Sequence, residues 1–128
     1  MDIILLIGRI LFAGVFLMFG INHFKKQAMM VQYAASRGVP SPKLAVIVGG
    51  LLLIAGGLGV ILGIYVTLAL WLLIIFLVPT TLAMHTFWKE TDPQNKMKEM
   101  VNFMLNTALI GAALMLLSLP LPWAMSIL

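Results

Sequence analysis

Four long runs of apolar residues dominate the chain, and the polar residues gather between them. The runs cover approximately residues 3–21, 44–63, 65–84 and 100–119. Each has about the 20 apolar residues that a helix needs to cross a bilayer. The pattern therefore predicts an all-α membrane protein, in which residues 1–128 form a single transmembrane domain built as an antiparallel bundle of four helices.

The segment between the first two runs has a different pattern. In residues 24–36 apolar side chains are interleaved with lysines and glutamines, and the segment ends at Arg37, Gly38 and Pro40. A basic residue followed by glycine and proline is a helix stop signal. The mixed polarity predicts an amphipathic helix that lies along the membrane interface, with a re-entrant segment as the alternative.

The other two connections are short. The second run passes into the third at Gly63-Ile64-Tyr65, with no longer break between them, which predicts a tight helical hairpin. Before the last run, residues 92–95 read Asp-Pro-Gln-Asn, which is a turn signal.

The basic residues predict the orientation of the chain. Loops 22–43 and 85–99 contain Lys25, Lys26, Arg37, Lys43, Lys89, Lys96 and Lys98. The opposite side has only Arg9. Because cytoplasmic loops are enriched in lysine and arginine, both loops are expected in the cytoplasm and both termini outside, in a multi-pass protein of the plasma membrane.

Composition narrows the function classes. The chain is 62% hydrophobic and 9% charged, whereas a soluble domain has roughly 25% charged residues. The net charge is +4, and most of the basic residues lie between the apolar runs. We therefore expect them to contact an anionic lipid surface and not nucleic acid. The absence of cysteine excludes disulfides, thiolate catalysis and most zinc or iron–sulfur sites.

Small residues recur at helical spacing in the second run. Gly49, Gly56 and Gly63 are seven apart, and Ala55, Gly59 and Gly63 are four apart. Such stripes let helices approach closely in lipid. We expect them to serve packing, within the bundle or in a homodimer, and not a ligand cradle.

Several polar residues share the loop side of the predicted bundle. The candidate ligand-binding residues are Asn22, His23, His85, Trp88 and Asn106. Imidazole and amide groups can hold the head group of a quinone, a polar lipid or another small amphiphile. The alternative is that the histidines are wetted by lipid head groups, Trp88 belongs to an aromatic belt and the asparagines join helices.

Arg9 is the one charged side chain well inside an apolar run, about 10 Å from the outer end by the helical rise. One interpretation is that it extends outwards to the lipid head groups. The other is a polar or anion site near the outer face, with the guanidinium turned inward against carbonyl oxygens or a bound acid.

The chain shows no complete set of catalytic residues and no metal-ligand cluster, so we predict neither a catalytic nor a metal site. A proton-coupled drug exporter is disfavoured because no run carries a carboxylate. Haem bound by the two histidines is disfavoured because both lie at helix ends.

The order of several short motifs resembles the DoxX family of small bacterial membrane proteins over nearly the whole chain. The motifs are Gly8-Arg9, Asn22-His23-Phe24, Tyr33-Ala34-Ala35, Gly38-Val39-Pro40-Ser41-Pro42, Leu62-Gly63, His85-Thr86-Phe87-Trp88, Asn106 and Leu109-Ile110-Gly111. The Gly-Val-Pro-x-Pro stretch is the most specific of them.

The resemblance implies a four-helix bundle in the bacterial inner membrane. It also implies a link to thiosulfate oxidation with quinone as acceptor, or to membrane complexes that detoxify oxidants. Two positions depart from the family pattern: Leu53 stands where many relatives have an acid, and Leu105 where many have lysine. A charge-coupled reaction that pairs such an acid with Arg9 is therefore harder to sustain in this chain.

These observations favour an accessory component of a membrane redox system that binds a quinone-like or lipid amphiphile at the cytoplasmic face. Such a component would work with a soluble or membrane redox partner, as a subunit of a quinone-linked oxidoreductase, without completing catalysis alone. A small dimeric transporter is one alternative. The other is a structural scaffold that recruits a soluble protein through its basic first loop.

Overall fold

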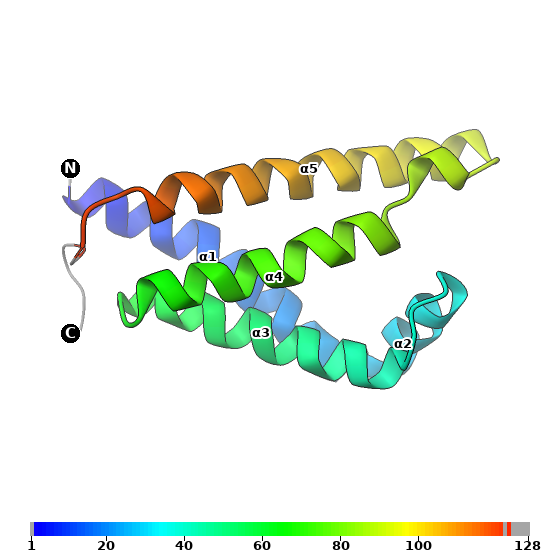
Figure 1. Ribbon diagram of the computed structural model, residues 1–128, viewed down its shortest axis with the longest axis horizontal. Coiled ribbons are helices and arrows are strands. Elements are labelled where there is room, and N and C mark those ends of the chain that lie inside the picture. The colour runs from blue at the N-terminus through cyan, green and yellow to red at the C-terminus, as the bar shows by residue number, and fades with distance from the viewer. Residues whose placement is uncertain (1, 122, 124–128) are drawn as a thin grey trace.

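Helices account for nearly all of the computed structural model, which describes residues 2–121 and 123 (Figure 1). In chain order they are α1 (Asp2–Lys25), α2 (Gln27–Ser36), α3 (Pro42–Leu62), α4 (Val66–Met84), the 3-10 helix η1 (Phe87–Lys89) and α5 (Pro93–Leu117). Four of them, α1, α3, α4 and α5, are long and apolar enough to cross a membrane. The predicted all-α membrane fold is confirmed.

The four long helices pack in the order α1, α3, α4, α5, and each runs antiparallel to its neighbour (Figure 1). Helix α1 crosses α3 at an angle, and α5 lies along α4. The start of α1, the α3–α4 turn and the end of α5 lie together, and we name this the terminal end. Helix α2 and η1 lie at the opposite end, which we name the loop end.

Glycines of α3 let its two neighbours approach closely. A Cβ atom built at Gly57 would lie 2.9 Å from Leu17 of α1, and one at Gly56 would lie 2.7 Å from Leu73 of α4. The small residues of the second span therefore serve packing within the bundle. By contrast, a Cβ atom built at Gly8, Gly14 or Gly111 would meet nothing within 4 Å.

The helical hairpin predicted at residues 63–65 is present. Gly63 ends α3 with φ of 73°, the left-handed conformation in which many helices terminate. Tyr65, just before α4, also has a positive φ of 47°, which is unusual for a residue with a side chain. The chain thus reverses within three residues.

Several predicted boundaries require correction. Helix α5 begins at Pro93 and not near 100, because Pro93 suits the first turn of a helix and the turn signal is in fact its start. Helix α1 continues to Lys25, so α2 begins at Gln27 and not at residue 24. The earlier start of α5 places Glu99 inside a helix and not in a loop.

Candidate functional site

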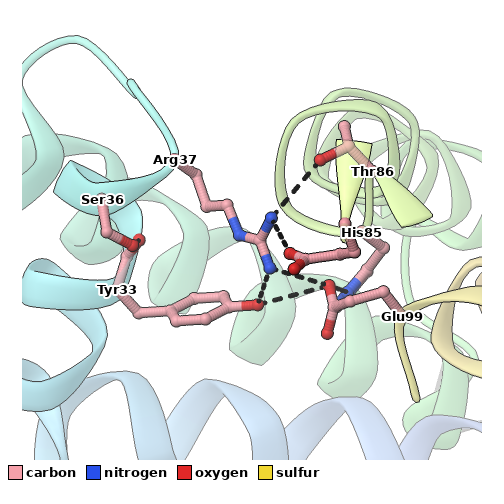
Figure 2. Close-up of polar contacts among 7 residues, drawn as sticks. Tyr33, Ser36, Arg37, His85, Thr86 and Glu99 are labelled. Atoms are coloured by element: carbon pink, nitrogen blue, oxygen red, sulfur yellow. Dashed lines mark hydrogen bonds and ion pairs between the residues drawn. The ribbon is translucent and has the colours of Figure 1, made fainter. Parts of the chain in front are cut away.

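Polar side chains from three parts of the chain are joined by hydrogen bonds and ion pairs at the loop end, most of which Figure 2 shows. Helix α2 and its end contribute Tyr33 and Arg37, the α4–α5 connection contributes His85, Thr86 and Glu90, and α5 contributes Glu99. We call these six residues the polar cluster. It joins segments 66 residues apart in the sequence, since Tyr33 contacts Glu99.

Glu99 is the centre of the polar cluster. The residue is only 3% exposed, and three donors approach the same oxygen, Oε2. His85 Nδ1 lies 3.1 Å away, the Tyr33 hydroxyl donates from 3.3 Å and Arg37 Nη2 lies 3.5 Å away. A buried carboxylate needs such partners to offset the loss of hydration.

Arg37 connects the cluster's two carboxylates. Its Nη1 lies 2.7 Å from Glu90 Oε1, and its Nη2 donates to the Tyr33 hydroxyl at 3.0 Å. Nη1 also reaches Thr86 Oγ1 at 3.5 Å, as Figure 2 shows. Burial lowers the Arg37 pKa, but the hydrogen bonds with Tyr33 and Glu90 outweigh this effect, so the pKa is raised overall.

The Tyr33 hydroxyl lies between Glu99, to which it donates, and Arg37, from which it accepts. Burial raises its pKa above the ordinary 10.0, the hydrogen bond from Arg37 lowers it and the charge of Glu99 raises it, for a net increase. Tyr33 therefore remains a protonated donor to Glu99 over the physiological range.

His85 follows directly after α4, and its ring is held through one nitrogen. If Glu99 is ionised, the Nδ1–H donates to it, which leaves Nε2 as the acceptor nitrogen of a neutral imidazole. Within the described residues Nε2 makes no hydrogen bond, and the side chain is 19% exposed. The carboxylate thereby fixes the tautomer and the orientation of the ring.

The cluster's charges are unequal when His85 is neutral. With both carboxyls ionised, Glu90 and Glu99 supply two negative charges and Arg37 supplies one positive charge. In that state the polar cluster carries one net negative charge.

Trp88 and His23, two other predicted residues, make their contacts outside the polar cluster. Trp88 is 52% exposed, and its ring packs edge-to-face on Phe87 and Phe103. His23 Nδ1 lies 2.7 Å from the Phe19 carbonyl, and its ring packs against Phe76 of α4. The structure gives His23 no hydrogen bond to the polar cluster within the described residues.

The two predicted asparagines are half-buried. Asn106 lies seven residues from Glu99 and seven from Ala113, both of which are buried, so the three share the inward face of α5. In the described part of the chain, neither Asn22 nor Asn106 makes a side-chain hydrogen bond. The Asn106 amide thus lies on the inward face of α5 without a hydrogen bond to another described residue.

Arg9 lies at the terminal end and is 1% exposed. Its guanidinium donates to the carbonyls of Val60 and Ile61, at 3.0 and 2.6 Å, and stacks against the ring of Trp123. The side chain is therefore turned inward, onto carbonyl oxygens that the end of α3 leaves unsatisfied. Leu53 is fully buried. It precedes Val60 by two turns of α3, which is about 10 Å along the helix.

Sequence reasoning identified His85 but missed the rest of the polar cluster. Arg37 was assigned only to topology and helix termination, and Glu99 was placed in a loop. One signal existed, because Glu99, Asn106 and Ala113 repeat every seven residues, as on one face of a helix. No group of three His, Asp or Glu side chains among the described residues could hold a metal ion.

Comparison with known proteins gives a family and one relative. The sequence model of the DoxX family matches residues 4–86, which extend from α1 to the end of α4 and Thr86. The inner membrane protein YphA of Escherichia coli K12 is 31% identical over 114 residues, covering 89% of this chain and 81% of that protein. No solved structure matches.

Proposed function

The chain belongs to the DoxX family, and from this premise we propose that it binds the oxygen-bearing head group of a quinone-like or lipid amphiphile at its loop end. In this proposal it is an accessory component of a membrane redox system in the bacterial inner membrane. The name of the relative YphA supports that location. The lysines and arginines of both loops support a cytoplasmic loop end.

The contact between His85 and the buried Glu99 carries the proposal. A ring held through Nδ1 can accept a hydrogen bond at Nε2 from a hydroxyl, or donate one to a carbonyl when the ring is protonated. These are the two oxygen functions that a quinol and a quinone present. The exposed Trp88, three residues after His85, packs on Phe87 and Phe103, and these three rings offer an aromatic surface.

The accessory role follows from what imidazole and carboxylate can do. These groups can hydrogen-bond an oxygen and transfer a proton, but they do not transfer electrons. Oxidation or reduction of a bound amphiphile therefore needs an electron carrier on a second protein or on a cofactor. The polar cluster would contribute the head-group site and the proton.

The first experiment measures what co-purifies with the protein. Wild type, His85→Gln and His23→Gln are purified in mild detergent, extracted with organic solvent and analysed by mass spectrometry and optical spectroscopy. We expect one amphiphile in stoichiometric amount in wild type and in His23→Gln, and a loss of at least about tenfold in His85→Gln.

His23→Gln is the matched control because His23 is also an interfacial histidine but binds the carbonyl of its own helix. Equal amphiphile content in all three proteins, or bulk lipid alone, would contradict the proposal. A further variant, Glu99→Gln, keeps the size of the side chain and removes its charge. It should weaken retention less than His85→Gln does.

A further inference from the structure

Thr81 is a buried polar residue whose hydroxyl has no partner. It is 3% exposed, and Oγ1 makes no hydrogen bond within the described part of the chain. It shares the inward face of α4 with the buried Leu77 and Leu73. An unsatisfied hydroxyl in apolar surroundings is costly, so a partner for it is expected in the working protein.

Thr81 lies one helical turn from His85. The backbone N–H of His85, the residue that follows α4, donates to the Thr81 carbonyl, which places His85 about one turn beyond Thr81. One turn corresponds to about 5.4 Å along the helix. The two oxygens of a para-quinone ring are separated by a similar length.

Helix α5 offers one amide at about the depth of Thr81 and another one turn deeper. Starting from the contact between Glu99 and His85, one turn along α5 leads to Asn102 and two turns lead to Asn106. Both are half-buried, and neither makes a side-chain hydrogen bond within the described residues. No charged side chain of α4 or α5 lies between this level and the terminal end.

We infer that the Thr81 hydroxyl is a second hydrogen-bonding subsite, one turn deeper than His85, which selects head groups that carry two oxygens. This inference rests on the proposed function, since it assumes that a first oxygen is held at His85. The deeper oxygen is a neutral carbonyl or hydroxyl, because the groups around it are a hydroxyl and amides. In this arrangement His85 binds the first oxygen of any head group, and Thr81 distinguishes head groups with a second oxygen from those without one.

The test compares two probes by calorimetry in detergent. One is a short-chain 1,4-benzoquinone with two ring oxygens, and the other is the matching cyclohexenone with one. Thr81→Val removes the hydroxyl at nearly constant volume, and Thr80→Val is the neighbouring control. We expect Thr81→Val to weaken quinone binding about fivefold and to leave cyclohexenone binding unchanged.

His85→Gln should weaken both probes, and Thr80→Val neither. If Thr81→Val changes neither probe or both equally, or if Thr80→Val has the same effect, the subsite is refuted while binding at His85 stands. An unchanged affinity with a higher thermal midpoint in Thr81→Val would show that the hydroxyl holds no ligand. If wild type binds neither probe, the proposed quinone-like ligand is refuted together with the subsite.

Discussion

Glu99 shows how a single buried side chain can organise a polar cluster at the loop end of the bundle. Its Oε2 is approached by Tyr33 of α2, by Arg37 just after α2 and by His85 just after α4. The partners differ in chemistry: a guanidinium is a charged donor, a phenol is a neutral donor, and an imidazole can donate or accept through its ring nitrogens. The carboxylate therefore holds His85 in place without itself contacting solvent.

Tyr33 predicts a specific dependence of stability on alkaline pH. Because its pKa is raised in the folded protein, the fold favours the protonated phenol. The contribution is fully present below pH 10.0, the ordinary pKa, and is lost as the pH rises through the raised value. Thermal unfolding of wild type in detergent should therefore become easier above pH 10 more steeply than that of Tyr33→Phe.

The phenylalanine variant lacks the ionisable group but keeps the ring against Arg37. Near neutral pH it should be less stable than wild type by roughly 1 kcal/mol, the usual value of a lost hydrogen bond. Parallel pH profiles for the two proteins would contradict the assigned role of Tyr33.

Arg9 predicts a stability effect at the other end of the bundle. In Arg9→Ala the carbonyls of Val60 and Ile61 lose their donors and Trp123 loses its stacking partner. We expect a decrease of about 2 to 3 kcal/mol in the free energy of unfolding. The stability of Arg9→Lys should lie between those of wild type and Arg9→Ala, because an ammonium keeps the charge but lacks the planar guanidinium that donates to both carbonyls.

The measurement is a denaturation midpoint in detergent for the three proteins. Equal midpoints for wild type and Arg9→Ala would show that the guanidinium does not hold the end of α3.

At the level of elements, the close approach of α3 to its neighbours depends on glycine. At Gly56 an added Cβ would lie 2.9 Å from the backbone carbonyl of Ala69 as well as 2.7 Å from Leu73. Gly56→Ala should therefore lower the free energy of unfolding by about 1 to 3 kcal/mol. Gly111→Ala is the matched control, since a Cβ there meets nothing within 4 Å and alanine favours helix.

Comparison of thermal midpoints in detergent tests this prediction. Gly111→Ala should be neutral or slightly stabilising. If the two variants behave alike, glycine at position 56 is not required for the α3–α4 contact.

The sequence was most informative about elements and least informative about their ends. Apolar runs and short turns gave the spans, because a bilayer imposes length and composition on each crossing helix. The start of α5 was misplaced, because the same Asp-Pro pair that marks a turn also begins a helix. The error hid Glu99, whose burial depends on contacts with α2 that local pattern does not report.

At the scale of the whole molecule, the orientation in the membrane is a prediction from charge alone. The chain has no cysteine, so single cysteines can be introduced and tested with a membrane-impermeant maleimide in intact cells. We expect Tyr65→Cys to react from outside, because Tyr65 is 79% exposed at the terminal end. Lys98→Cys at the loop end should react only after the cells are opened.

The opposite labelling pattern would place the loop end outside the cell. It would also move the proposed head-group site to the outer leaflet. Labelling of both positions in intact cells would contradict the four-span topology itself.

The packing order of the helices has a consequence for how the protein is made. Helix α3 packs on α1, α4 on α3 and α5 on α4, so each new span finds its partner already synthesised. The imidazole of His85 meets the carboxylate of Glu99 only when α5, the last span, has docked. The completed contact therefore distinguishes a bundle in which α5 has docked from one that still lacks its last helix.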